Sequence, residues 1–199
     1  MTTIVRETRE TRIELALRAD AGPAAGEAAA ASDAEIATGE PFLDHMLRTL
    51  ARFAAFQLRV EASGDLRHHL VEDAAIALGL ALRDETPDRC VRFGHAVVPM
   101  DDALVEATVD AGGRAYYEGP IPSALYDHFL RSFASNAGMT LHVRVLRGRD
   151  RHHQVEAAFK AVGLALRKAL VRGDVVFSTK GAVRLEIATG GAEPPPRAT

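Results

Sequence analysis

The sequence predicts an α+β fold with an internal duplication: two similar modules, each with a four-stranded, mostly antiparallel sheet and two helices on one face. Three observations support this. Stretches in which apolar and polar residues alternate, as in strands, precede stretches with helical spacing. The pattern HHxVE occurs at 68–72 and again at 152–156. The preceding segments also repeat, as DHMLRTLA at 44–51 and DHFLRSFA at 127–134, so the two halves share one plan.

The first module is predicted to cover residues 1–86. Its first strand is expected over 3–19, where Ile13, Leu15 and Leu17 alternate with polar or small residues. The segment 20–38 is expected to be a loop, because most of it is rich in alanine and glycine and has no periodicity. The remaining predicted elements are a helix at 42–56, a strand at 56–62 and a helix at 68–83.

The second module is predicted to cover residues 87–187 and to repeat this order. Asp101 and Asp102 separate two alternating segments, which indicates a hairpin or a bulge. The predicted elements are strands at 91–100, 103–110 and 140–146, with helices at 126–138 and 152–167. Residues 188–199, which are rich in proline, glycine and alanine, are expected to form a disordered tail.

Composition excludes several classes of protein. The chain has 199 residues, 47% apolar and 26% charged, with a formal net charge of −3, as in an ordinary globular protein. Its 24 basic residues are scattered among 27 acidic ones, so we expect no nucleic-acid partner. No apolar run reaches the roughly 18 residues of a membrane span. The single cysteine, Cys90, excludes an intrachain disulfide, and the charged N-terminus lacks the apolar segment of a signal peptide. These features predict a cytoplasmic protein that binds no membrane.

Histidine and glutamate recur at the duplicated positions. Residues four apart lie on one face of a helix, so His68 can stand over Glu72, and His152 over Glu156. Imidazole with carboxylate is the ligand set that Mn, Fe and Zn take from proteins. The alternative is two solvated helix starts that happen to look alike. With the histidine of each DH dipeptide included, the candidate metal ligands are His45, His68, His69, Glu72, His128, His152, His153 and Glu156.

Each half of the chain thus offers three histidines and one glutamate, which suits two divalent ions that keep positions for water or substrate. Adjacent histidines on a helix diverge. One HH pair is therefore expected to serve two different ions, and an ion could join the two halves or two subunits.

A candidate phosphate site lies near the C-terminus. Phe177 precedes Ser178-Thr179-Lys180-Gly181, and Lys180 is one of only three lysines beside 21 arginines. Two hydroxyls followed by lysine and glycine, in a turn after a strand, supply donors and a positive charge suited to phosphate.

These motifs together resemble the imidazoleglycerol-phosphate dehydratase family of histidine biosynthesis. The resemblance spans nearly the whole chain and rests on RETRETRI, FLDHML, HHLVEDAAIALG, RFG with VPMDDAL, GGR, DHFLRSFA, HHQVEAAFKA and STKG, in the order of the family. The chain departs from the family pattern at two places. Gly39-Glu40-Pro41 replaces the usual Gly-Ile-Gly, and Leu66-Arg67 replaces acidic residues before the first HH pair.

The resemblance implies a lyase that dehydrates D-erythro-imidazole-glycerol phosphate to imidazole-acetol phosphate and water, with two Mn²⁺ ions per subunit. It assigns metal binding to the same eight residues and catalytic roles to His45, His69 and His153. Glu10 corresponds to the substrate-binding glutamate that acts as acid and base, and Arg92, Arg114, Ser178 and Lys180 correspond to the phosphate-binding residues. The family assembles trimers into a 24-subunit shell with the metals at subunit contacts, so the expected partners are the small phosphorylated imidazole and further copies of this chain.

Two other functions stay open. One is another two-metal lyase or hydrolase that acts on a phosphorylated small molecule. The other is an inactive metal-binding assembly protein, which would not need Glu10, Arg92, Arg114 or Lys180.

Overall fold

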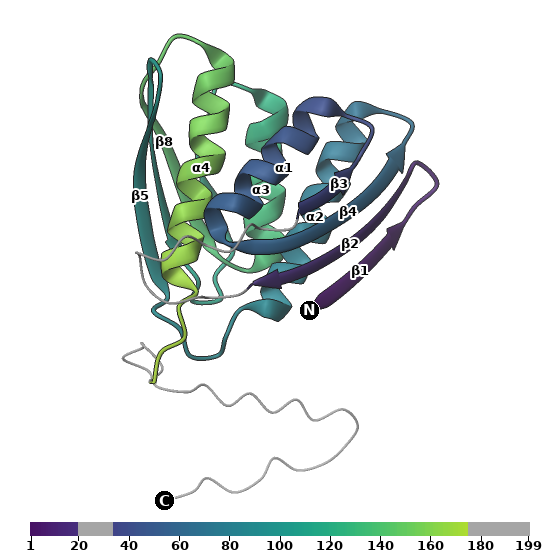
Figure 1. Cartoon of the computed structure of the whole chain (residues 1–199), viewed down its shortest axis with the longest axis horizontal. Coiled ribbons are helices and arrows are strands. Elements are labelled where there is room, and N and C mark those ends of the chain that lie inside the picture. Colours follow the sequence, from purple (N-terminus) through teal and green to yellow (C-terminus); the bar gives the residue numbers. More distant parts are fainter. Residues whose placement is uncertain (20–33, 175–199) are drawn as a thin grey trace, which may run out of the picture.

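The computed structural model describes residues 1–19 and 34–174, which form two sheets and four helices (Figure 1). In chain order the elements are β1 Thr2–Glu7, β2 Thr11–Ala19, β3 Ala34–Ala37, α1 Pro41–Ala54, β4 Phe56–Gly64, α2 Arg67–Glu85, β5 Phe93–Met100, β6 Ala103–Asp110, β7 Tyr116–Glu118, α3 Ala124–Ala137, β8 Thr140–Arg147 and α4 Arg151–Ala169. The predicted tail at 188–199 lies outside the described residues.

Each sheet consists of three antiparallel strands and a short fourth strand added in parallel. The first sheet has the order β1-β2-β4-β3, with β3 parallel to β4. The second sheet repeats this arrangement as β5-β6-β8-β7, with β7 parallel to β8. The predicted α+β fold, duplicated and mostly antiparallel, is therefore confirmed.

Three strand predictions are corrected by the structure. The strand expected over 3–19 is two strands, β1 and β2, separated by a turn at residues 8–10, because the polar and apolar alternation continues on both sides of that turn. The loop expected over 20–38 contains β3, and β7 was not expected at all. Both are three or four residues long, too short to show a period.

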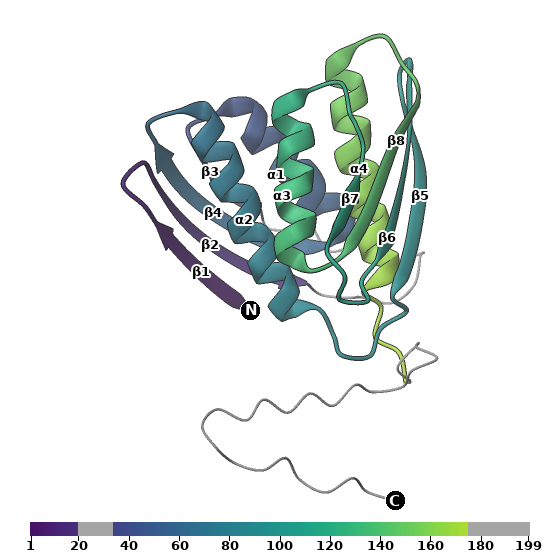
Figure 2. The ribbon, with the colours of Figure 1, turned by 180° about the vertical axis from the view of Figure 1, so that it is seen from behind.

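The helices lie between the two sheets, and the view from behind shows the same layers (Figures 1 and 2). Strand β2 turns Ile13, Leu15 and Leu17 toward the helices, and all three side chains are buried. Tyr126 and Phe129 of α3 contact the ring of Phe159 on α4, with ring centroids 5.9 and 5.3 Å away. Buried apolar residues of both modules belong to one continuous cluster, so the two modules share a core.

The modules are joined by close helix pairs, α1 with α4 and α2 with α3. Gly79 of α2 faces the backbone of α3, where an added Cβ atom would lie 2.6 Å from the carbonyl oxygen of Phe133. Gly163 stands at the duplicated position of α4, where an added Cβ atom would lie 3.0 Å from the backbone nitrogen of Ala54 on α1. Only glycine lets the paired helices approach this closely.

No helix in the described ranges is both long enough and apolar enough to cross a membrane.

We predict that Gly79→Ala and Gly163→Ala each lower the free energy of unfolding by about 1–3 kcal/mol, because the added methyl group meets backbone that cannot move aside. Alanine is otherwise the better helix former by about 1 kcal/mol. A decrease in the free energy of unfolding would therefore come from the helix contact, because helix propensity alone would increase it. Chemical denaturation measures it, with the partly exposed Leu80→Ala as the control on the same helix. A Gly79→Ala protein as stable as the parent would contradict the close contact.

Candidate functional site

The predicted ligands lie in the first two turns of the four helices. His45 and His128 are each the fifth residue of their helices, α1 and α3. His68 and His152 are each the second residue of theirs, α2 and α4. Because the helices of each close pair begin at the same end, their first turns meet there, and residues from both modules come together.

The first group, which we name the Glu156 cluster, consists of His45, His152 and Glu156. Oε2 of Glu156 lies 3.1 Å from Nε2 of His152 on the same helix and 3.1 Å from Nε2 of His45 on α1. The two imidazole rings are stacked, with centroids 5.9 Å apart. Burial acts to raise the pKa of Glu156, but hydrogen bonds from Lys160 and His45 outweigh it and hold that pKa below its usual value.

The second group, the Glu72 cluster, repeats this geometry with the modules exchanged. Oε2 of Glu72 lies 3.6 Å from Nε2 of His68 on α2, and Oε1 lies 3.2 Å from Nε2 of His128 on α3. The rings of His68 and His128 are stacked, with centroids 5.3 Å apart. Each cluster therefore takes a histidine and a glutamate from one module and a histidine from the other.

Both clusters suit a divalent ion. In each cluster, one ring nitrogen of each histidine and one oxygen of the glutamate all lie within 4.8 Å of one another. Within the described residues, Nε2 of His128 is buried and has no hydrogen-bond partner, although it faces the Glu72 carboxylate. A buried ring nitrogen usually has a partner. A metal ion bound between the three side chains would supply it, and the donor set of two imidazoles and a carboxylate fits Mn²⁺, Fe²⁺ or Zn²⁺.

The second histidine of each HH pair points away from these clusters and is held by carboxylates from turns. Nδ1 of His69 lies 3.0 Å from Oδ1 of Asp65 and 3.4 Å from Oε2 of Glu10. The hydrogen bond to Asp65 raises the pKa of His69. A third possible ligand group is formed by Glu10, Asp65 and His69. The predicted divergence of the HH pair is thus present in the geometry of α2.

His153 has an equivalent environment in the second module. Its Nδ1 lies 2.7 Å from Oδ1 of Asp102 in the turn between β5 and β6. The hydrogen bond with His153 lowers the pKa of Asp102 to about 2, and the same bond raises the pKa of His153. A carboxylate that holds Nδ1 orients the ring, an arrangement common among histidine ligands of metals. Nε2 of His153 lies 3.4 Å from Oδ2 of Asp101.

Glu10 is exposed, but its backbone is firmly fixed in the turn between β1 and β2. Its carbonyl oxygen accepts a hydrogen bond from the Asp65 amide, and its own amide donates to Oγ1 of Thr8. The next residue, Thr11, donates its hydroxyl to the buried carboxylate of Asp73 on α2. Arg6 donates to the other oxygen of Asp73 at 3.0 Å. The turn that carries Glu10 is thereby attached to the helix that carries Glu72 and His69.

The two departures from the family pattern face each other. Oε2 of Glu40 accepts a hydrogen bond from the Leu43 amide and caps α1. Oε1 of the same carboxylate lies 3.4 Å from the guanidinium of Arg67, the first residue of α2. The Tyr126 hydroxyl donates to Glu40 from α3 at 3.3 Å. Glu40 and Arg67 therefore form an ion pair between the helix starts that carry the two clusters.

The two arginines predicted to bind phosphate lie at the far end of the helices. The Arg92 amide donates to the carbonyl oxygen of Ala169, the last residue of α4. Its guanidinium pairs with Asp110, and the hydrogen bond from Arg92 together with the charge of Arg114 helps to hold the pKa of that carboxyl below its usual value. Ser178 and Lys180 lie outside the described residues.

Sequence reasoning missed several residues that shape the site. Asp102 is predicted only as a turn residue, and the sequence assigns no role to Asp65 or to Lys160, which lies 2.9 Å from Glu156. A signal was present for each. Asp65 stands four residues before His69, Asp102 lies in the VPMDDAL motif, and Lys160 stands four residues after Glu156.

Comparison with known proteins agrees with these motifs. A sequence profile described as Imidazoleglycerol-phosphate dehydratase matches residues 38–166. A protein of that name from Granulibacter bethesdensis is 44% identical over 200 residues, which cover 91% of this chain and 97% of the relative. Another from Methanosarcina mazei is 41% identical over 194 residues, which cover 89% of this chain and 96% of the relative.

Two solved structures share the fold. The protein in the crystal structure of IGPD from Pyrococcus furiosus is 38% identical in sequence to this chain, with a TM-score of 0.78. The match covers 90% of this chain and 100% of that one. Imidazoleglycerol-phosphate dehydratase from Staphylococcus aureus is 30% identical, with a TM-score of 0.72, over 86% of this chain and 98% of that one. As its motifs predicted, the chain belongs to the imidazoleglycerol-phosphate dehydratase family, the hydro-lyases of histidine biosynthesis.

Proposed function

We propose that this protein catalyses the metal-dependent dehydration of D-erythro-imidazole-glycerol phosphate to imidazole-acetol phosphate and water. The observation that carries the proposal is the pair of clusters, each built from two histidines and one glutamate drawn from both modules. Family membership supports the reaction, and the donor set supports the metal dependence.

Two Mn²⁺ ions per chain are proposed, one in each cluster. His45, His152 and Glu156 would hold one ion, and His68, Glu72 and His128 the other. A bound divalent ion supplies a Lewis acid that polarises the imidazole ring of the substrate. His69 and His153 are the remaining proposed ligands, and both have Nδ1 held by a carboxylate, which leaves Nε2 as the nitrogen for an ion. These two histidines would complete sites on neighbouring chains.

Glu10 is the proposed acid and base. Removing a proton from carbon and expelling hydroxide both need a group that carries a proton to or from the reacting atoms. Glu10 suits this role because its exposed carboxylate lies beside His69 on a turn attached to α2. The attachment fixes the backbone of Glu10 relative to the Glu72 cluster.

Arg92 and Arg114 would bind the substrate phosphate together with Ser178 and Lys180. In a single chain, Arg92 and Arg114 cannot reach the phosphate of a substrate whose ring is bound at the clusters. Helix α4 separates Arg92 from His152 and, with 19 residues, is roughly 27 Å long. Only a three-carbon chain joins the ring to the phosphate in the substrate. A complete active site therefore needs at least two copies of the chain.

The division of each proposed active site between the clusters of one chain and the arginines of another supports a homo-oligomer. The family resemblance suggests a 24-subunit shell built from trimers. We also propose a cytoplasmic location, on the grounds that the buried Cys90 is a free thiol and that free thiols persist in reducing compartments.

The direct test is an assay with the imidazole substrate. Protein stripped by a chelator should lose turnover, and added Mn²⁺ should restore it, with imidazole-acetol phosphate as the product. Binding of Mn²⁺ without turnover would favour the inactive assembly protein. Turnover of other phosphorylated compounds in place of this substrate would favour a different lyase or hydrolase.

A second prediction tests Glu10 and the shared site together. Glu10→Gln should lower turnover by about 10²-fold or more, the usual scale for loss of a general acid or base, and leave Mn²⁺ binding nearly unchanged. Arg114→Ala should raise KM, because the phosphate loses a partner. When the two variants are co-expressed as a mixed oligomer, some sites combine an intact Glu10 with an intact Arg114 from another chain. At substrate concentrations well below the KM of Arg114→Ala, activity should then rise above that of either variant alone.

The matched control is the double variant Glu10→Gln/Arg114→Ala co-expressed with the wild-type chain at the same ratio. A mixture of the single variants that is no more active than its separate components would place both residues of each site on one chain. Parent-level turnover of Glu10→Gln would remove Glu10 from the mechanism.

A further inference from the structure

The duplicated helices differ at one position beside the two clusters. Lys160 stands four residues after Glu156 on α4, and the equivalent residue of α2, four residues after Glu72, is Ile76. Residues four apart on a helix are neighbours on its surface. A lysine is therefore placed beside Glu156, and an apolar residue takes that place beside Glu72.

Lys160 forms an ion pair with one of the two carboxylate oxygens of Glu156. Its Nζ lies 2.9 Å from Oε1, within the distance of a charge-assisted hydrogen bond. The other oxygen, Oε2, lies 3.1 Å from both His45 and His152. One oxygen of this glutamate is thus committed to a cation, and the other faces the imidazoles.

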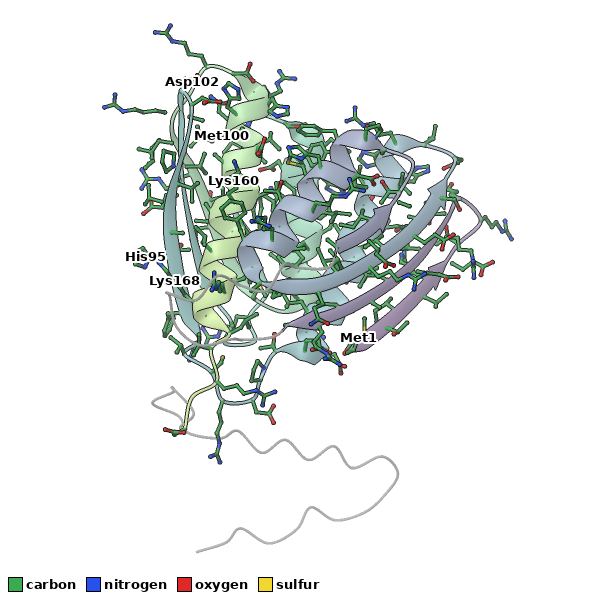
Figure 3. The ribbon with its side chains drawn as sticks, in the orientation of Figure 1. Met1, His95, Met100, Asp102, Lys160 and Lys168 are labelled. Carbon is green, nitrogen blue, oxygen red and sulfur yellow. The ribbon has the colours of Figure 1, made fainter. Side chains whose placement is uncertain are left out.

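The surroundings hold Lys160 in place. Figure 3 shows it on α4 beside Met100 at the end of β5, and its Nζ lies 3.5 Å from the Met100 sulfur. Nζ also lies 5.7 Å from the centre of the Phe53 ring, within the range of a cation–π interaction. These contacts and a side chain only 20% exposed hold the ammonium group beside Glu156.

Glu72 has a different environment. Its two oxygens face two different histidines, His128 at 3.2 Å and His68 at 3.6 Å, and these are its ion-pair partners in the described part of the chain. Its side chain is 36% exposed, against 9% for Glu156. No lysine or arginine pairs with Glu72 within the described residues, so both of its oxygens are left to face the imidazoles and an ion.

We propose that the two clusters bind divalent ions unequally, the Glu72 cluster tightly and the Glu156 cluster weakly, because Lys160 neutralises Glu156. A positive charge so close to the ligand set opposes an incoming cation and removes one ligand oxygen. The inference rests on the proposed metal dependence. It means that one ion stays bound and the other exchanges.

The test is a titration of the metal-stripped full-length chain with Mn²⁺, with free Mn²⁺ measured by electron paramagnetic resonance. The wild-type chain should show two classes of binding site, each taking one ion. Their dissociation constants should differ by about tenfold or more, a typical effect of a group that contacts a metal ligand. Lys160→Met should tighten the weaker class by about tenfold and leave the tighter class unchanged.

The duplication offers a matched control. Ile76→Lys places a lysine beside Glu72 and should weaken the tighter class by a similar factor, so that the two classes merge. Lys160→Arg keeps the positive charge and should keep two classes. Both variants remain informative if Lys160→Met fails to fold.

Equal dissociation constants for the two ions in the wild-type chain would overturn the proposal while the metal dependence stands. An unchanged ratio of the two dissociation constants in Lys160→Met would do the same. A chain that binds no Mn²⁺ at all would overturn the proposed metal function and this inference with it.

Discussion

Glu72 and Glu156 each lie between two imidazoles, one on the same helix and one from the other module, and the rest of the structure maintains that geometry. It requires α1 with α4, and α2 with α3, to begin at one end and to lie in close contact. Gly79 and Gly163 permit this approach, because any larger residue would meet the backbone of the partner helix. The sheets cover the outer sides of this helix layer and bury their apolar faces against it (Figure 1). The fold therefore builds two equivalent clusters from one repeated unit.

This arrangement carries an electrostatic cost. Helix N-termini have partial positive charge and favour anions, yet the four helices bring six histidines to this end. Carboxylates offset the charge: Asp150 caps α4, Glu40 caps α1, and Asp65 and Asp102 hold the outer histidines. Glu72 and Glu156 place two further carboxylates at this end. Such a concentration of polar groups at one end contributes little to a core, which is typical of a functional site that the remaining fold stabilises.

The sequence was informative where a feature is local. Helical spacing placed the HH pairs and both glutamates on the correct faces, and alternation identified most of β2, β4, β6 and β8. It could not show that His45 meets Glu156 or that His128 meets Glu72, because those contacts depend on helix pairing between modules. The contacts of His69 and His153 with hairpin carboxylates depend in the same way on tertiary structure. The distance between Arg92 and the clusters, on which the proposed shared site depends, also follows only from the length and direction of α4.

The central claim is that each ion is held by residues of both modules. Anomalous X-ray scattering at the manganese edge, from crystals of the Mn²⁺-loaded protein, tests it most directly. Two peaks per chain are expected, one bounded by His68, Glu72 and His128 and one by His45, His152 and Glu156. A single peak, or ions held by the HxxxE pair of one helix without the histidine of the other module, would contradict it.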